Sequence, residues 1–145
     1  MKPQDPHFEK KIKELFSKAN FISELGVQLK SISPGQCKTT LQVQPRHMQQ
    51  NKFVHAGVQA TMADHTAGAA AGSLIKADEI ILTVEFKINF LRPALGESLR
   101  CQSDVLKAGK NIYVAESEVF SISKGEEKLT AKSMITLSVV KWQNC

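Results

Sequence analysis

A segment rich in alanine and glycine, residues 56–75, constrains the fold of this chain more than any other feature. Its length and composition are those of a helix, but it has few large side chains and a single carboxylate, Asp64, near its middle. Gly68 and Gly72 each cost about 1 kcal/mol of helix propensity relative to alanine. That cost is tolerated where close approach of neighbouring elements repays it, so we expect a thin helix at the centre of the fold.

The remaining pattern is mainly that of β-strands. Residues 79–93 alternate apolar and polar side chains, which predicts a long strand with one apolar face that ends at Pro93. The apolar positions are Ile80, Leu82, Val84, Phe86, Ile88 and Phe90. Further strands are predicted at 25–33, 36–44, 98–107, 111–123 and 127–141, with a short amphipathic helix at 7–19. This order predicts a single α+β domain, 1–145, in which an antiparallel sheet wraps around the long helix.

Composition and charge narrow the range of functions. The chain has 19 Lys and Arg residues against 14 Asp and Glu, a net charge of +5, but the basic residues are scattered. One Trp and one Tyr give little surface for stacking on bases, so nucleic-acid binding is not expected. The cysteines, Cys37, Cys101 and Cys145, form no CxxC motif, which is typical of reduced thiols. With no signal peptide and no convincing membrane span, we expect a cytoplasmic protein without membrane association.

The start of the long helix is suited to stabilise a negative charge. Its first amides have no partner within the helix, the helix dipole adds to their positive potential, and Gly57 lets a ligand approach the backbone. His55, just before it, can add a hydrogen bond. A metal site made from His55, Asp64 and His65 is not expected, because adjacent helix positions do not converge. Purely structural roles for His55, Gly57 and Asp64 are the alternative.

Asp64 lies seven residues after Gly57, on the same side of the helix but on the order of 10 Å along its axis. One helix therefore cannot bring its own Asp64 to a carbonyl bound at its start. An antiparallel helix from a second copy could do so, which predicts a two-fold homodimer with composite sites.

The motif 54-VHAGVQATMADHTAGAAA-71 resembles the helix motif of hotdog-fold thioesterases, in the phenylacetate-pathway (PaaI-like) acyl-CoA thioesterase group. The family pattern is His-Gly-Gly followed by Asp or Glu nine residues after the histidine, a spacing that His55 and Asp64 share. Residues 83–99 are similar to the strand and Gly-Glu turn that follow in the family. Ala56 stands where many members have their first glycine.

This resemblance implies an acyl-CoA thioesterase in which the Gly57 amide polarises the thioester carbonyl and Asp64 acts as nucleophile or general base. It implies that His55 supports the carbonyl or the thiolate, and that an amide side chain shortly before it, from Gln49, Gln50 or Asn51, orients the substrate or water. It also implies no cofactor.

Thr83 matches a strand residue that assists the attacking water in the family. Because strict alternation would put Thr83 on the polar face of its strand, this role requires a bulge. Other expected substrate-binding residues lie in the two motifs or near turns, where basic side chains could bind the phosphates of CoA: Val54, Ala56, Asn89, Arg92, Lys107 and Lys110.

Two other functions remain open at this stage. One is a non-catalytic, regulatory hotdog protein that binds acyl-CoA, and the other is a hotdog hydratase or dehydratase. A dimer of dimers is an alternative to the homodimer. The small side chains of Ala60, Ala67 and Gly68 leave room for a ring or a medium chain, or serve packing alone.

Overall fold

The computed structural model describes residues 1–142, and Cys145 lies outside this range. The helices are α1 (Phe8–Lys18), α2 (Asn20–Leu25) and α3 (Ala56–Gly72), with a short 3-10 helix, η1 (Pro45–His47), between β2 and α3. The strands are β1 (Gln28–Ser33), β2 (Gln36–Gln42), β3 (Glu79–Phe90), β4 (Ser98–Ala108), β5 (Ile112–Ser123) and β6 (Glu126–Lys141). The predicted order of elements is confirmed, with two additions, α2 after Ala19 and η1 before α3. Because α2 extends to Leu25, the first strand begins at Gln28 and not at the predicted residue 25.

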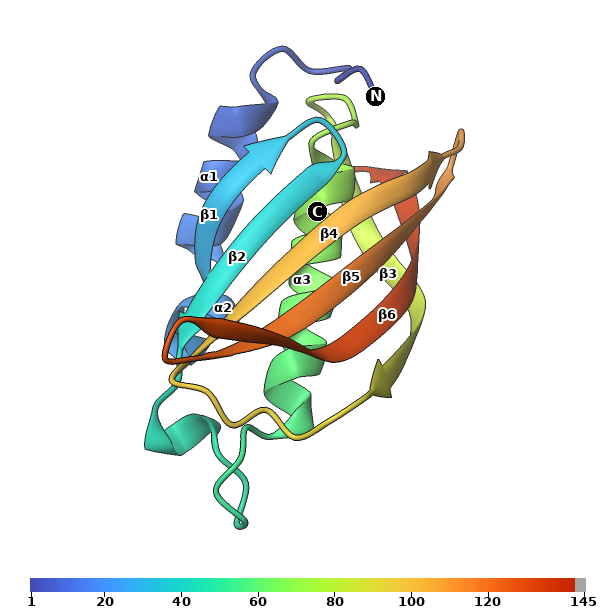
Figure 1. The fold of residues 1–145 in the computed structure, drawn as a ribbon. Helices are drawn as coiled ribbons and strands as arrows, with labels where there is room; N and C mark the ends of the chain where they lie inside the picture. The colour runs from blue at the N-terminus through green and yellow to red at the C-terminus, as the bar shows by residue number, and fades with distance from the viewer. Residues whose placement is uncertain (143–145) are drawn as a thin grey trace.

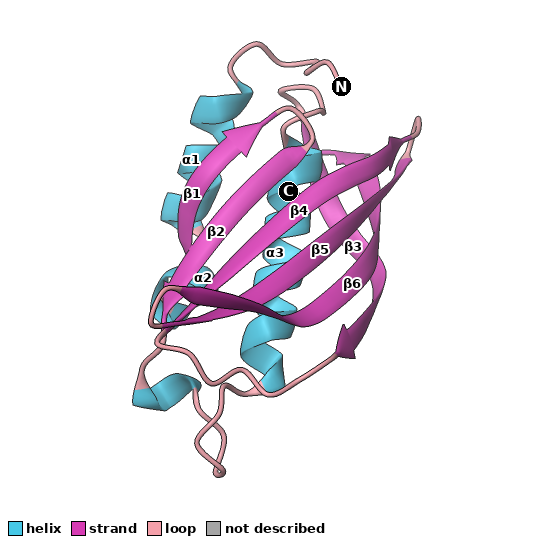
Figure 2. Cartoon of the chain, viewed as in Figure 1, coloured by secondary structure: helices cyan, strands magenta, loops and turns pink. Residues whose placement is uncertain are grey.

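The six strands form one antiparallel sheet in the order β1-β2-β4-β5-β6-β3. The sheet curls around α3, which runs through the middle of the molecule, and α1 lies beside β1 (Figures 1 and 2). This is the α+β arrangement that the sequence predicted. β3 lies at one edge of the sheet, and within residues 1–142 only its β6 side is paired.

Small side chains let α3 lie close to the sheet. Ala63, Ala67 and Ala70 are fully buried. Polar groups on this face are also satisfied by direct bonds to the sheet: Thr66 Oγ1 is 2.8 Å from Thr39 Oγ1, and Ser117 Oγ donates to the Ala63 carbonyl at 2.8 Å. The composition that made 56–75 unusual is therefore explained by contact with the strands around the helix.

The prediction that β3 has a single apolar face is wrong. Thr83 is opposite Leu137 while Glu85 is opposite Thr136, so Val84 is an extra residue in a β-bulge. Ile81 and Thr83 face α3 before the bulge, and Phe86 faces it afterwards, opposite the buried Ile135.

As a result, apolar side chains of β3 lie on both faces of the sheet. Leu82 and Val84 are 52% and 59% exposed, and Phe86 and Phe90 on the other face are 41% and 45% exposed. A strand at the edge of a sheet with this much exposed apolar surface is unusual for an isolated chain.

Cys37 and Cys101 are free and buried on the neighbouring strands β2 and β4. Burial raises the pKa of each thiol to about 12. Both are therefore unreactive packing residues rather than nucleophiles. No helix within the described residues is long and apolar enough to cross a membrane.

Candidate active site

The first residues of α3 are exposed and are organised by His55. His55 is the N-cap, and its Nδ1 accepts a hydrogen bond of 2.8 Å from the Gly57 amide. The Gly57 amide, which we expected to bind a carbonyl, is therefore already occupied in this conformation. Among the hydrogen bonds of the described residues, none involves the amide of Ala56. The open donor at the start of the helix is thus Ala56.

His47 holds the loop that leads to this helix, a role that the sequence analysis missed. Its buried ring accepts at Nδ1 from the Gln44 amide at 2.9 Å, and its Nε2 is 2.7 Å from the carbonyl oxygen of Leu25. The His47 carbonyl then accepts from the His55 amide at 2.8 Å. His47 therefore connects α2 to the N-cap of α3, and only its position between two turns could have suggested this.

Residues 48–54 form a narrow hairpin that projects from the body of the protein (Figure 1). Gln49 lies at the base of this hairpin, where its backbone N–H donates to the Phe53 carbonyl at 2.9 Å. Asn51 lies at the exposed tip. Val54, expected to contact substrate, is instead buried and donates to the Ala94 carbonyl at 3.0 Å. Its role is to anchor the hairpin to the connection between β3 and β4.

Asp64 and Thr83 lie in direct contact. The Thr83 hydroxyl donates to Asp64 Oδ1 at 2.7 Å, joining the middle of α3 to β3. The bulge at Val84 makes this contact possible, because it turns Thr83 toward the helix. No ion pair among the described residues involves Asp64, so a cation does not neutralise this carboxylate.

Two hollows meet at Asp64. One, of about 450 Å³, extends past Ala60 toward Phe21 and Phe86. The other, of about 380 Å³, extends past Gly68 between α1 and β3. The linings are mainly apolar, so Asp64 is a polar group set between two apolar recesses, the arrangement expected of a small-molecule site.

His65 also lines both hollows, although we assigned it no role. Its ring packs edge-on against Phe16, with the centroids 4.6 Å apart. Its Nε2 is buried with no hydrogen-bond partner. Burial lowers the pKa of His65, and the charge of Asp64 opposes this effect. A neutral imidazole therefore lies next to the carboxylate.

The remaining expected substrate residues do not gather around Asp64. Asn89 lies on the face of β3 away from α3, where it accepts a hydrogen bond of 2.8 Å from Lys87 Nζ. Arg92 follows β3 on the exposed connection whose Ala94 carbonyl accepts from the Val54 amide, two residues before α3 begins. Lys107 and Lys110 flank the β4–β5 turn, at the end of the sheet near the C-terminus of α3. Only Arg92 is therefore near the open end of the helix in this chain.

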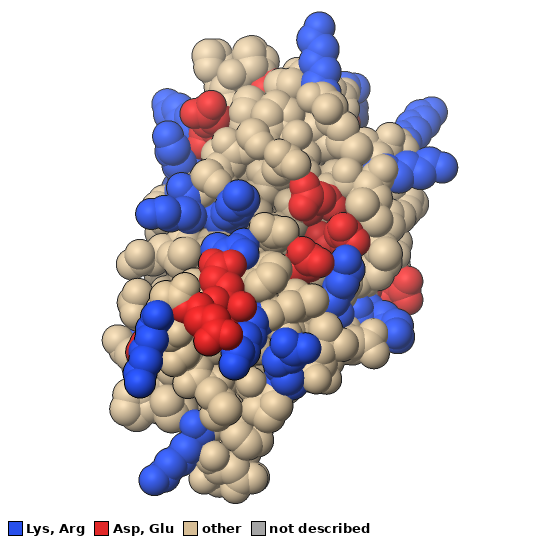
Figure 3. Space-filling view, in the orientation of Figure 1, with Lys and Arg blue, Asp and Glu red and all other residues tan. Residues whose placement is uncertain are grey.

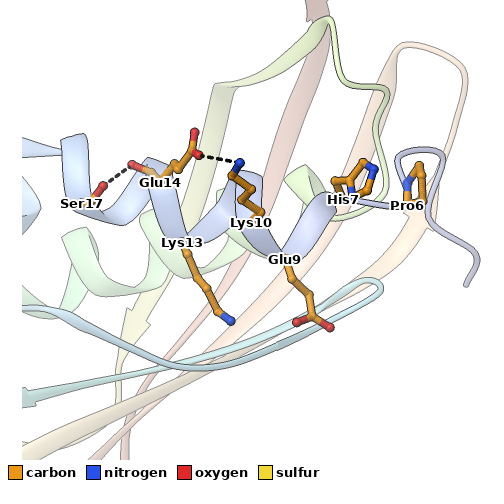
Figure 4. A pocket seen from close by; sticks show the side chains of 7 residues that line it. All are labelled: Pro6, His7, Glu9, Lys10, Lys13, Glu14 and Ser17. Atoms are coloured by element: carbon orange, nitrogen blue, oxygen red, sulfur yellow. Dashed lines mark hydrogen bonds and ion pairs between the residues drawn. The ribbon is translucent and has the colours of Figure 1, made fainter.

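Charges elsewhere on the surface are mixed. Blue and red side chains are interspersed over the face in Figure 3. Among the ion pairs of the chain, Lys132 pairs with both Glu116 and Glu118. A further hollow of about 590 Å³ follows the exposed side of α1, where Lys10 pairs with Glu14 (Figure 4). It contains no residue of the Asp64 site. No cluster of three metal-ligating side chains occurs within residues 1–142.

Comparisons with known proteins agree with this fold. The sequence pattern of the thioesterase superfamily matches residues 51–128. A thioesterase family protein from Silicibacter pomeroyi is 32% identical, with a TM-score of 0.91 over 93% of this chain and 99% of that chain. The 1,4-dihydroxy-2-naphthoyl-CoA hydrolase of Listeria monocytogenes is 27% identical over 117 residues, 81% of this chain and 93% of that protein.

The E. coli PaaI protein of the phenylacetic acid degradation operon shares the fold, with a TM-score of 0.82 over 92% of this chain and 93% of that one, at 19% identity. The chain has the hotdog fold and belongs to the thioesterase superfamily. It is therefore a member of a class of thioester hydrolases.

Proposed function

We propose that this protein is an acyl-CoA thioesterase that hydrolyses its substrate to a free acid and CoA, with Asp64 as general base or nucleophile. The observation that carries the proposal is the hydrogen bond from Thr83 to Asp64, made where two apolar hollows meet. A carboxylate without a paired cation, held by a hydroxyl beside apolar recesses, is suited to act on a bound ester.

The open amide of Ala56 is the proposed donor to the thioester carbonyl. It points from the start of a helix of 17 residues, where the dipole favours the negative charge that develops on the carbonyl oxygen. His55 orients this end of the helix through its bond to Gly57. Gln49, at the base of the projecting hairpin, is better placed than Asn51 to orient water or substrate, because Asn51 lies at the tip.

The proposed reaction breaks one C–S bond. As general base, Asp64 takes a proton from water, the hydroxide adds to the carbonyl carbon, and CoA leaves as a thiolate that recovers the proton. As nucleophile, Asp64 forms a mixed anhydride with release of the thiolate, and water then cleaves the anhydride. In both routes the hydrogen bond from Thr83 orients the carboxylate of Asp64 for attack.

We propose that a second copy completes the site. The Ala56 amide and Asp64 of one helix are on the order of 12 Å apart along its axis, too far to act on one carbonyl. The unpaired edge of β3 and its exposed apolar side chains fit a two-fold partner that adds its own β3 and places the helices antiparallel. Arg92, Lys107 and Lys110 are then candidates for contact with the CoA phosphates.

The test is thiol release from acyl-CoA esters by wild type, Asp64→Asn and Thr83→Val. We expect Asp64→Asn to lower kcat by about 10² to 10⁴, the range for loss of a general base. Thr83→Val should lower it by about tenfold, because it removes one hydrogen bond to a charged group. Circular dichroism and thermal melting establish that both variants fold.

Three results would contradict this proposal, the first its mechanism and the other two its reaction. Unchanged turnover in Asp64→Asn would remove the carboxylate from the mechanism. Binding of acyl-CoA by wild type without thiol release would favour the regulatory protein. Addition of water to an enoyl-CoA, with no thiol release, would favour the hydratase.

A further inference from the structure

Gly68 lies on the wall of the hollow between α1 and β3, one helical turn beyond Asp64. A Cβ added at Gly68 would meet no atom within 4 Å. By contrast, a Cβ at Gly72 would lie 3.0 Å from Ile12 Cδ1. The absence of a side chain at Gly68 therefore does not serve helix packing, and its effect is to leave space beside the candidate catalytic acid.

The hollow beside Gly68 is an apolar channel that starts at Asp64 and Thr83. Its walls are Ile12 and Leu15 of α1 on one side and Ile81 of β3 on the other. With a rise of about 1.5 Å per residue, the distance along α3 from Asp64 to Gly72 is about 12 Å. An extended alkyl chain advances about 1.2 Å per bond, so this length matches roughly eight to ten carbons.

Ile75 and Lys11 line the far end of the channel. Lys11 Nζ donates to the carbonyl oxygens of Lys76 and Glu79, both at 2.7 Å, and so ties α1 to the turn after α3. The Lys11 ammonium, the cationic group in the lining of the channel, is therefore already bonded to backbone oxygens. A chain that fills the channel therefore meets apolar walls, and at the far end the Lys11 ammonium is not free to bind a polar terminus.

We propose that Gly68 is the specificity-determining residue for the acyl group, and that it admits a straight aliphatic acyl chain of medium length into this channel. The proposal rests on the thioesterase function proposed above and adds its substrate class. The carbonyl carbon lies at Asp64 and the chain runs past Gly68 toward Lys11. Each methylene buried in such a channel contributes about a fourfold factor in binding.

The other hollow provides a matched control. Ala60 lines it four residues before Asp64, as Gly68 lines the channel four residues after. Ala60→Val and Gly68→Val place the same side chain on opposite sides of the acid. The choice between the two recesses can thus be tested by one substitution in each.

The experiment measures kcat/KM of wild type, Gly68→Val and Ala60→Val for acetyl-, butyryl-, octanoyl- and dodecanoyl-CoA. We expect wild type to prefer octanoyl-CoA. Gly68→Val should lower the ratio of octanoyl to acetyl kcat/KM at least tenfold, because its branches displace two or more methylenes at about fourfold each. Ala60→Val should change that ratio by less than about threefold on the same basis.

The outcomes separate this inference from the function on which it rests. Octanoyl-CoA hydrolysis with an unchanged chain-length ratio in folded Gly68→Val would overturn the role of Gly68 alone. A loss of octanoyl preference in Ala60→Val instead would place the chain in the other recess and would also overturn it. No thiol release by wild type from any ester would reject the proposed function, and this inference with it.

Discussion

His65 shows how one buried side chain couples this site to pH. Burial against Phe16 lowers its folded-state pKa below the ordinary value of about 6.5, while the unfolded chain keeps that value. The unfolded state therefore binds more protons as pH falls below about 6.5, and the free energy of unfolding decreases. The stabilising effect of neutral His65 is present above pH 6.5 and is lost as pH falls through the lowered pKa.

The measurement is thermal melting of wild type and His65→Phe between about pH 5 and pH 8. We expect the melting temperature of wild type to fall more steeply toward acid pH than that of the variant, in which a ring of similar size packs on Phe16 without titrating. Parallel curves for the two proteins would contradict a role for His65 in this dependence.

At the scale of residues, the sequence predicted the site in part. Asp64 and Thr83, each chosen from its own motif, are in contact in the structure, and their roles in catalysis stay predictions. The Gly57 amide was not predicted correctly as an open donor, since a cap formed by His55 depends on a rotamer that no spacing reveals. Val54 and Asn89 lie in the motifs but point into the core and to the outer face, respectively.

At the scale of elements, α3 contains two glycines with different surroundings. Gly68 lies inside the helix beside open space, so Gly68→Ala should raise the free energy of unfolding by about 0.5–1 kcal/mol through helix propensity. Gly72 is the last residue of α3, and its added Cβ would press on the fully buried Ile12. Gly72→Ala should therefore give no gain in stability or a loss.

Urea unfolding of the two single variants beside wild type measures this difference. Thermal melting gives a second measure, because 1 kcal/mol corresponds to a shift of about 3 °C in melting temperature for a chain of this size. Equal effects of the two substitutions would show that packing around α3 does not distinguish these positions.

The sequence predicted every strand of the sheet but not the shape of β3. Alternation of apolar and polar residues is a reliable sign that a strand exists. For residues 79–93 it also led to the prediction that all the alternating apolar side chains lie on one face. The bulge at Val84 shifts the pattern by one residue, so the apolar residues before and after it lie on different faces. Because β3 has apolar residues on both faces, the apolar–polar alternation continues through the bulge, and the extra residue cannot be recognised from the sequence.

At the scale of the whole molecule, two observations point beyond a single chain. The Ala56 amide and Asp64 lie on one helix yet too far apart for one carbonyl, and the edge strand β3 exposes apolar side chains on both faces. A two-fold dimer that pairs the β3 edges would account for both observations. It would cover the exposed apolar side chains of β3, and its antiparallel helices would bring the start of one α3 beside the middle of the other. We expect sedimentation to give a dimer or a dimer of dimers.

Composite sites predict that two inactive variants restore activity when mixed. Ala56→Pro removes the proposed carbonyl donor, and proline is tolerated at the first position of a helix. His55 has the extended backbone, φ −60° and ψ 138°, that a following proline requires. Ala56→Pro and Asp64→Asn should each lose most hydrolysis as homodimers, the former by about 10² to 10³.

Mixed dimers of these two variants contain one site with both defects and one site with none. If subunits exchange freely, half of the dimers are mixed and half of their sites are intact, so activity should return to about one quarter of wild type. The measurement is thiol release after co-refolding the variants at equal concentration, with each variant refolded alone as the control. Recovery no greater than that of the separate variants would mean that amide and carboxylate act within one chain, and would reject the composite site.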